Sequence, residues 1–161
     1  MTQTSVTKLN GRLDKLVSSL PGSGYALNVA LVYEDALTWK WAKNIFDRAE
    51  KLAGSNVVRG TWWKLGDLSH PGVLAGAVSQ AMRADLVVVA HTATEGLPLS
   101  FYVWVNSWLP HHLPGGSALV ALLGAVERPN AESGRVREYL RAVARQGRMH
   151  FLLAEQSPAD S

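Results

Sequence analysis

Residues 84–109 read ADLVVVAHTATEGLPLSFYVWVNSWL, and this stretch decides the fold. Leu86–Ala90 is an uninterrupted apolar run, rich in valine, that ends at His91. A run without alternation is typical of a strand covered on both faces, as strands of parallel sheets are. Pro98 suits the first turn of a helix, which we expect to extend to about Leu109. The stretch therefore predicts a central strand, its exit loop and a helix that packs back on the sheet.

Apolar runs and helical patterns alternate on both sides of this stretch. The other expected strands are Tyr25–Tyr33, Asn56–Lys64, Ser117–Gly124 and Met149–Glu155. The other expected helices are Ala36–Ala53, Pro71–Ala84 and Ser133–Gln146. Such alternation predicts an α/β fold, a three-layer α/β/α sandwich around a five-stranded parallel sheet of order 2-1-3-4-5. Arg59 and Lys64 interrupt the second strand, which places it nearer an edge.

A separate segment, residues 1–24, precedes this unit. Thr7–Leu20 places its leucines on one helical stripe, and Pro21–Gly24 ends the pattern. We expect residues 1–24 to form an amphipathic helix and linker that packs against its own domain or against a second copy. Residues 25–161 then form the α/β domain.

Composition excludes several classes of protein. A chain of 161 residues suits one domain with a sizeable core. It has no cysteine, which excludes disulfides, thiolate catalysis and Cys-based zinc sites. There is no apolar stretch of about 18 residues that would span a membrane, and the N-terminus lacks the apolar segment of a secretory signal. We expect a cytoplasmic protein without membrane contact.

Polar side chains follow the expected strands at the edge where such folds bind ligands. They are Glu34, Asp35, His91, Thr92, Thr94 and Glu95. We expect these residues to line a cleft, where carboxylates can bind Mg²⁺ or act as general acids and bases. The alternative is that polar residues end apolar strands because loops meet water.

The VYED stretch that ends at Asp35, within five alternating strands, resembles the receiver domains of response regulators. That resemblance implies Mg²⁺ held by an acidic pair, here Glu34 and Asp35, and a phosphoryl-accepting Asp after the third strand. His91 follows the third strand instead, and Gly124 stands where a hydroxyl residue is expected. The resemblance therefore implies a pseudo-receiver, a regulatory module without the phosphoacceptor.

Ala84–Ala90, Leu97-Pro98 and Trp108-Leu109 match the outline of NADPH-dependent FMN reductases, within the flavodoxin-like superfamily. This resemblance implies an FMN phosphate cradled by a Ser/Thr/Gly-rich loop after the first strand. This chain has Glu34–Thr38 there, and its two carboxylates repel a phosphate dianion. We therefore expect no cofactor. An FMN- or nucleotide-binding oxidoreductase, using the cleft at the strand ends, is the alternative function.

The helix expected at Pro98–Leu109 is apolar on nearly every side. A surface helix needs a polar face, so this one is either covered by the N-terminal helix or forms an interface. The candidate interface residues are Leu99, Tyr102, Val103, Trp104 and Trp108. A two-fold homodimer is the simplest assembly, and Trp104→Glu is then expected to dissociate it. We interpret the chain as a non-catalytic regulatory or protein-interaction module that works through this helix.

Two further patterns carry less weight. Arg137, Arg141, Arg145 and Arg148 lie along one side of the last expected helix, and a solvated face explains them as well as phosphate contacts do. His111 and His112 are adjacent and point in different directions. We expect neither a nucleic-acid partner nor a metal site.

Overall fold

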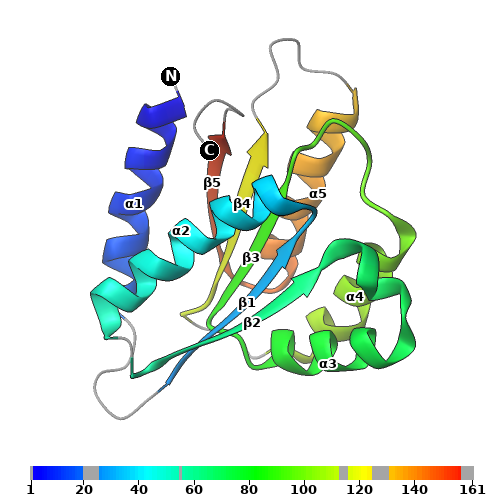
Figure 1. Cartoon of the computed structure of the whole chain (residues 1–161), viewed down its shortest axis with the longest axis horizontal. Coiled ribbons are helices and arrows are strands. Elements are labelled where there is room, and N and C mark those ends of the chain that lie inside the picture. Colours follow the sequence, from blue (N-terminus) through cyan, green and yellow to red (C-terminus); the bar gives the residue numbers. More distant parts are fainter. Residues whose placement is uncertain (1, 20–25, 55, 113–115, 125–130, 157–161) are drawn as a thin grey trace.

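The structure is a computed structural model that describes residues 2–19, 26–54, 56–112, 116–124 and 131–156 (Figure 1). One sheet of parallel strands runs through the molecule in the order β2-β1-β3-β4-β5. The strands are β1 (Leu27–Tyr33), β2 (Val58–Lys64), β3 (Leu86–His91), β4 (Ala118–Gly124) and β5 (His150–Gln156). This is the strand order of a flavodoxin-like α/β fold, so the predicted fold class is confirmed.

Helices cover both faces of the sheet and make the three predicted layers (Figure 1). They are α1 (Thr2–Ser19), α2 (Ala36–Ala53), α3 (Pro71–Met82), α4 (Leu99–Trp108) and α5 (Ala131–Gln146), with 3-10 helices η1 (Leu65–Ser69) and η2 (Leu109–His111). α1 and α2 pack on one face, and α3, α4 and α5 pack on the other. Right-handed crossovers require this division, because the β1-to-β2 connection crosses the sheet in the opposite direction to the later connections.

α1 covers the part of the first face that α2 leaves open. Leu9 and Leu13 are fully buried in the core cluster that also contains residues of β3, β4 and β5. Arg12 donates a hydrogen bond from its guanidinium to the Phe151 carbonyl oxygen on β5, at 2.8 Å. The amphipathic helix therefore packs against its own chain, one of the two possibilities that the sequence left open.

β3 lies at the centre of the sheet, and all of its residues are buried. Leu86, Val88 and Ala90 face α1 and α2, whereas Val87 and Val89 face α3, α4 and α5. The apolar run that predicted a doubly covered strand thus has the environment expected of it.

Some boundaries differ from the predictions. α3 ends at Met82 rather than Ala84. The Ala84 N–H donates to the carbonyl of Ala81, three residues back, instead of continuing the α-helical pattern of four. The predicted linker Pro21–Gly24 lies outside the described residues. Among the helices described, none combines the length and the apolar character needed to cross a membrane.

Candidate functional site

Glu34 and Thr92 join the ends of the two central strands β1 and β3. One carboxylate oxygen of Glu34 accepts hydrogen bonds from the Thr92 backbone N–H at 3.1 Å and from its hydroxyl at 2.9 Å. The Thr92 hydroxyl also lies 3.2 Å from that of Thr94. The strand register brings Tyr33 beside Ala90, so the residues that follow each strand meet at the same edge. The structure thus brings Glu34, Thr92 and Thr94 of the predicted set together at this edge.

His91 is the neighbour of Thr92 in the chain, lies next to the Glu34 carboxylate and is only 2% exposed. Its Nδ1 accepts a hydrogen bond from the Ala93 backbone N–H at 2.9 Å, so the proton of the neutral ring is on Nε2. Nε2 lies 3.5 Å from the second carboxylate oxygen of Glu34. Burial lowers the pKa of His91 below 6.5, although the carboxylates of Glu34, Asp35 and Glu95 oppose that shift. His91 is therefore a neutral, internally bonded ring.

Asp35 turns away from Glu34 and caps α2. Its carboxylate accepts the Thr38 backbone N–H at 3.0 Å, and the Thr38 hydroxyl accepts the N–H groups of Glu34 and Asp35, each at 2.8 Å. This is a capping box, and it fills the position at which a helix N-terminus would receive an anion. The arrangement does not suit a flavin phosphate after β1.

The predicted acidic cluster therefore divides into separate parts. Glu34 bonds to the β3 loop and Asp35 to α2, while Glu95 is exposed. Within the described part of the chain, no three His, Asp or Glu side chains are grouped closely enough to hold a metal ion. The receiver-like interpretation implies that Glu34 and Asp35 bind magnesium together. Among these residues, the two carboxylates do not converge on a shared ligand position.

The loop after β3 is closely fitted to β4. Ala93 has a φ of 63°, in the left-handed region that is unfavourable for alanine. A Cβ built on Gly124, the last residue of β4, would collide with the Thr92 backbone carbonyl. Gly124 is thus required by a close backbone approach, a role that the sequence pattern did not indicate.

The candidate interface on α4 needs correction. Trp104 and Trp108 are fully buried, in the core formed with α3 and α5, so they are unavailable to another molecule. Tyr102 is half-buried against Tyr139 of α5, with ring centroids 4.7 Å apart. α1, the cover suggested by the sequence, lies on the opposite face of the sheet. Leu99 and Val103 are the interface candidates that remain exposed.

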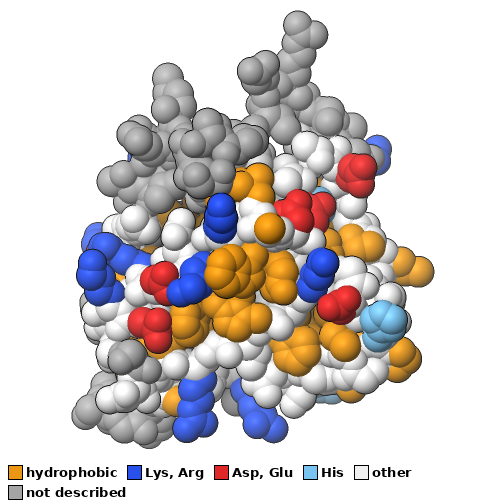
Figure 2. All heavy atoms as spheres, in the orientation of Figure 1, with side chains coloured by type: hydrophobic (Ala, Val, Ile, Leu, Met, Phe, Trp, Pro, Cys, Tyr) orange, Lys and Arg blue, Asp and Glu red, His pale blue; other side chains and the backbone are white. Residues whose placement is uncertain are grey.

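A different apolar surface lies at the β2 edge of the sheet. Trp39 of α2 is 36% exposed, and its ring centroid is 5.7 Å from that of Trp62 on β2. Phe46 lies edge-on to Trp62 at 5.5 Å. Figure 2 shows hydrophobic side chains gathered over α2 and β2, with Lys and Arg side chains around them. We call Trp39, Phe46 and Trp62 the aromatic cluster. The sequence hinted at it only through Trp39, which falls off the buried stripe of its helix.

The two edge strands differ in how they are covered. The N–H and C=O groups of successive residues in a strand point alternately to its two sides. On β5, the His150 N–H points toward β4, because it donates to the carbonyl of Ser117, the residue before β4. Phe151 therefore points outward, and Arg12 binds its carbonyl. At the other edge, the Leu27 N–H of β1 donates to the Val57 carbonyl, so the backbone groups of Val57 point toward β1. Every second residue from the next one onward therefore directs its backbone groups away from the sheet: Val58, Gly60, Trp62 and Lys64. Among the described residues, no segment pairs with those groups.

Comparisons with known proteins add little to this geometry. No protein-family model matches the sequence, and no curated protein sequence matches it. A solved structure that is similar is that of Trp repressor binding protein from Bacillus subtilis, at 9% sequence identity. The similarity covers 80% of this chain and 84% of that one, with a TM-score of 0.48.

Proposed function

We propose that this chain is a non-catalytic protein-interaction module that forms a two-fold homodimer through the outer edge of β2. The observation that supports the proposal is the outer edge of β2, which no described segment covers and which runs beside the aromatic cluster. An edge strand with unpaired backbone groups is a template for pairing with another strand. The contact surface thus moves from α4, where the sequence placed it, to β2.

The strand-end groups support a structural role at the other candidate site. Glu34 is hydrogen-bonded to Thr92, His91 bonds to the backbone of its own loop, and Asp35 caps α2. A catalytic pair needs a free acid or base within reach of substrate. These groups instead hold the exit loops of β1 and β3 in place.

The register of β2 suits pairing with a second copy of itself. In an antiparallel pair centred on Thr61, outward-facing Gly60 lies opposite the partner's Trp62, and outward-facing Val58 lies opposite the partner's Lys64. Opposed residues whose backbone groups both point outward can exchange hydrogen bonds. Phe46 covers Gly60 in each copy, so the partner's Trp62 meets an aromatic ring there. The pairing joins two aromatic clusters into one surface, as a self-complementary interface requires.

Lys64→Pro tests this proposal with little disturbance of the fold. Lys64 has a φ of −77°, close to the value that proline imposes, and its N–H points away from β1. The variant removes an intermolecular donor and leaves the β1–β2 ladder intact. We expect the dissociation constant, measured by sedimentation equilibrium, to rise at least tenfold.

Lys64→Ala is the matched control, because it removes the same charged side chain and keeps the N–H. We expect it to change the dissociation constant less than threefold. A wild-type protein that is monomeric at high micromolar concentration contradicts the proposal. A dimer that Lys64→Pro leaves unchanged also contradicts it, since the contact would then lie elsewhere.

A further inference from the structure

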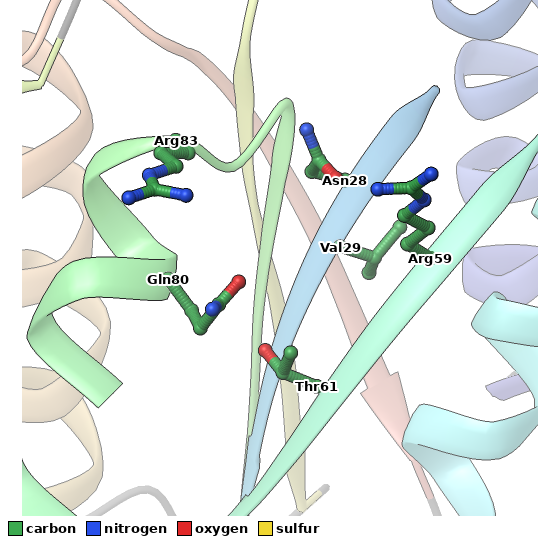
Figure 3. A pocket seen from close by; sticks show the side chains of 6 residues that line it. All are labelled: Asn28, Val29, Arg59, Thr61, Gln80 and Arg83. Atoms are coloured by element: carbon green, nitrogen blue, oxygen red, sulfur yellow. The ribbon is translucent and has the colours of Figure 1, made fainter. Parts of the chain in front are cut away.

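A hollow of about 320 Å³ lies on the face of β2 opposite the aromatic cluster, at the N-terminal ends of β1 and β2 (Figure 3). It is lined by Asn28, Val29, Arg59, Thr61, Gln80 and Arg83. The hollow exists because α3 ends at Met82, which leaves the beginning of these two strands uncovered on that face. Its volume is at the lower end of those found for small-molecule sites.

The sheet changes character where it faces this hollow. Ala30 and Val32 of β1 are buried on the face covered by α3, α4 and α5, and Asn28 has the same orientation because side chains alternate along a strand. On β2, Arg59 and Thr61 likewise share the face of Trp63. Asn28 is paired in register with Arg59. An otherwise apolar sheet face therefore becomes polar at adjacent positions of two strands.

The side chains that line the hollow are rich in hydrogen-bond donors. The Thr61 hydroxyl accepts the indole N–H of Trp63 at 3.0 Å, so its own proton remains available to donate. The side chains of Arg59 and Arg83 lie on opposite sides of the hollow, and that of Gln80 extends from α3 toward the strands (Figure 3). Each guanidinium offers a planar set of donors that matches a carboxylate or a phosphate.

Neither arginine has an acidic partner among the residues that the structure describes. Over the described residues, neither Arg59 nor Arg83 forms an ion pair or a side-chain hydrogen bond. Asp85 is close in sequence, but its carboxylate accepts the Asn28 backbone N–H at 2.9 Å. Two guanidinium groups beside one hollow raise the local positive potential, which an anionic ligand would relieve.

We propose that this hollow binds a small organic molecule that bears an oxyanion, a phosphate or a carboxylate group, between Arg59 and Arg83. The Thr61 hydroxyl and the amides of Asn28 and Gln80 contact the rest of the ligand. The site lies on the N-terminal side of the sheet, away from the strand ends where folds of this class bind ligands. It does not depend on the proposed dimer, because all six residues that line it belong to one chain.

The test is a titration of the ¹⁵N-labelled full chain with inorganic phosphate and, separately, with succinate, at constant ionic strength. We expect saturable amide shifts at Arg59, Thr61 and Arg83. Saturation by phosphate alone identifies a phosphate-bearing ligand, whereas saturation by succinate alone identifies a carboxylate-bearing one. The same titration of Lys64→Pro separates this result from dimer formation.

The double variant Arg59→Gln/Arg83→Gln is expected to weaken binding at least tenfold. Arg145→Gln on α5 is the control, since it removes an exposed guanidinium that does not line the hollow, and we expect a change of less than twofold. Shifts that do not saturate, or that spread equally to the arginines of α5, overturn the proposal. Equal weakening by Arg145→Gln overturns it as well, because binding would then reflect overall charge.

Discussion

The carboxylate of Glu34 connects the end of β1 to Thr92, the first residue after β3, through two hydrogen bonds to one oxygen. We predict that Glu34 and Thr92 stabilise the fold as a pair. Glu34→Ala should lower the free energy of unfolding by about 1–3 kcal/mol, because it leaves the Thr92 donors without a partner. A double-mutant cycle with Thr92→Ala should show a coupling of about 1 kcal/mol. Independent, additive effects in urea unfolding would contradict this prediction.

His91 should make stability fall as the solution is acidified. Burial holds the pKa of His91 below 6.5 in the folded chain, so the unfolded chain takes up a proton first as the pH drops below 6.5. Proton uptake by the unfolded state lowers the free energy of unfolding, by at most about 1.4 kcal/mol per pH unit for one group. His91→Asn should reduce the slope of stability against pH between about pH 7 and pH 5, whatever its effect at neutral pH. An unchanged slope would show that His91 does not titrate differently in the two states.

Gly124→Ala should destabilise the protein by about 1–3 kcal/mol, as overpacking does. The new Cβ meets the Thr92 backbone carbonyl, which cannot move without disturbing the loop held by Glu34. Gly134→Ala is the control, because nothing lies near its added Cβ and it is in a helix. The free energy of unfolding of that variant should rise by about 0.5–1 kcal/mol. Thermal unfolding of the two variants side by side distinguishes them by the sign of the change.

Tyr139 should remain protonated under alkaline conditions in which ordinary tyrosines ionise. Burial, and next the nearby Tyr102, raise the pKa of Tyr139 from 10.0 to about 12. Stability is therefore intact below pH 10 and declines as the pH rises toward 12, since the unfolded chain releases this proton first. Tyr139→Phe should remove the latest step of the tyrosinate absorbance titration. If that step persists in the variant, it belongs to another tyrosine.

Trp104→Ala should lower the free energy of unfolding by about 3–5 kcal/mol, the usual loss when a buried aromatic ring is deleted. Leu99→Ala, on the same helix, should cost less than about 0.5 kcal/mol, because Leu99 is 78% exposed. Urea unfolding monitored by circular dichroism measures both. Similar losses in the two variants would contradict the assigned burial. The sequence suggested that Trp104→Glu would dissociate an oligomer. Because Trp104 is fully buried, we now expect this variant to lose its fold instead.

The sequence predicted the layers and the strand order because uninterrupted apolar runs and helical stripes report directly on two-sided and one-sided burial. It could not predict what covers α4. Periodicity shows that the helix has no polar face, but not whether neighbours or another molecule surround it; here α3 and α5 bury Trp104 and Trp108. The Asp-x-x-Thr spacing at Asp35 and Thr38 is a capping signal that was available in the sequence.

The remaining features depend on contacts between distant segments. Trp39 and Trp62 become neighbours only when α2 packs on β2, and Gly124 meets Thr92 only when β4 pairs with β3. Arg59 and Arg83 flank one hollow because of where α3 stops. No local pattern contains that information, so these features required the structure.

The packing of α1 on β5 has a consequence for the order of folding. Arg12 and Phe151 are 139 residues apart, so their contact joins α1 to a strand that is synthesised much later. At about 5–20 residues per second on a ribosome, α1 waits roughly 7–28 s for β5 to be made. During that time Leu9 and Leu13 lack their partners on β5. The apolar stripe of α1 is therefore exposed until β5 is made, and it is the surface that a ribosome-associated chaperone would meet.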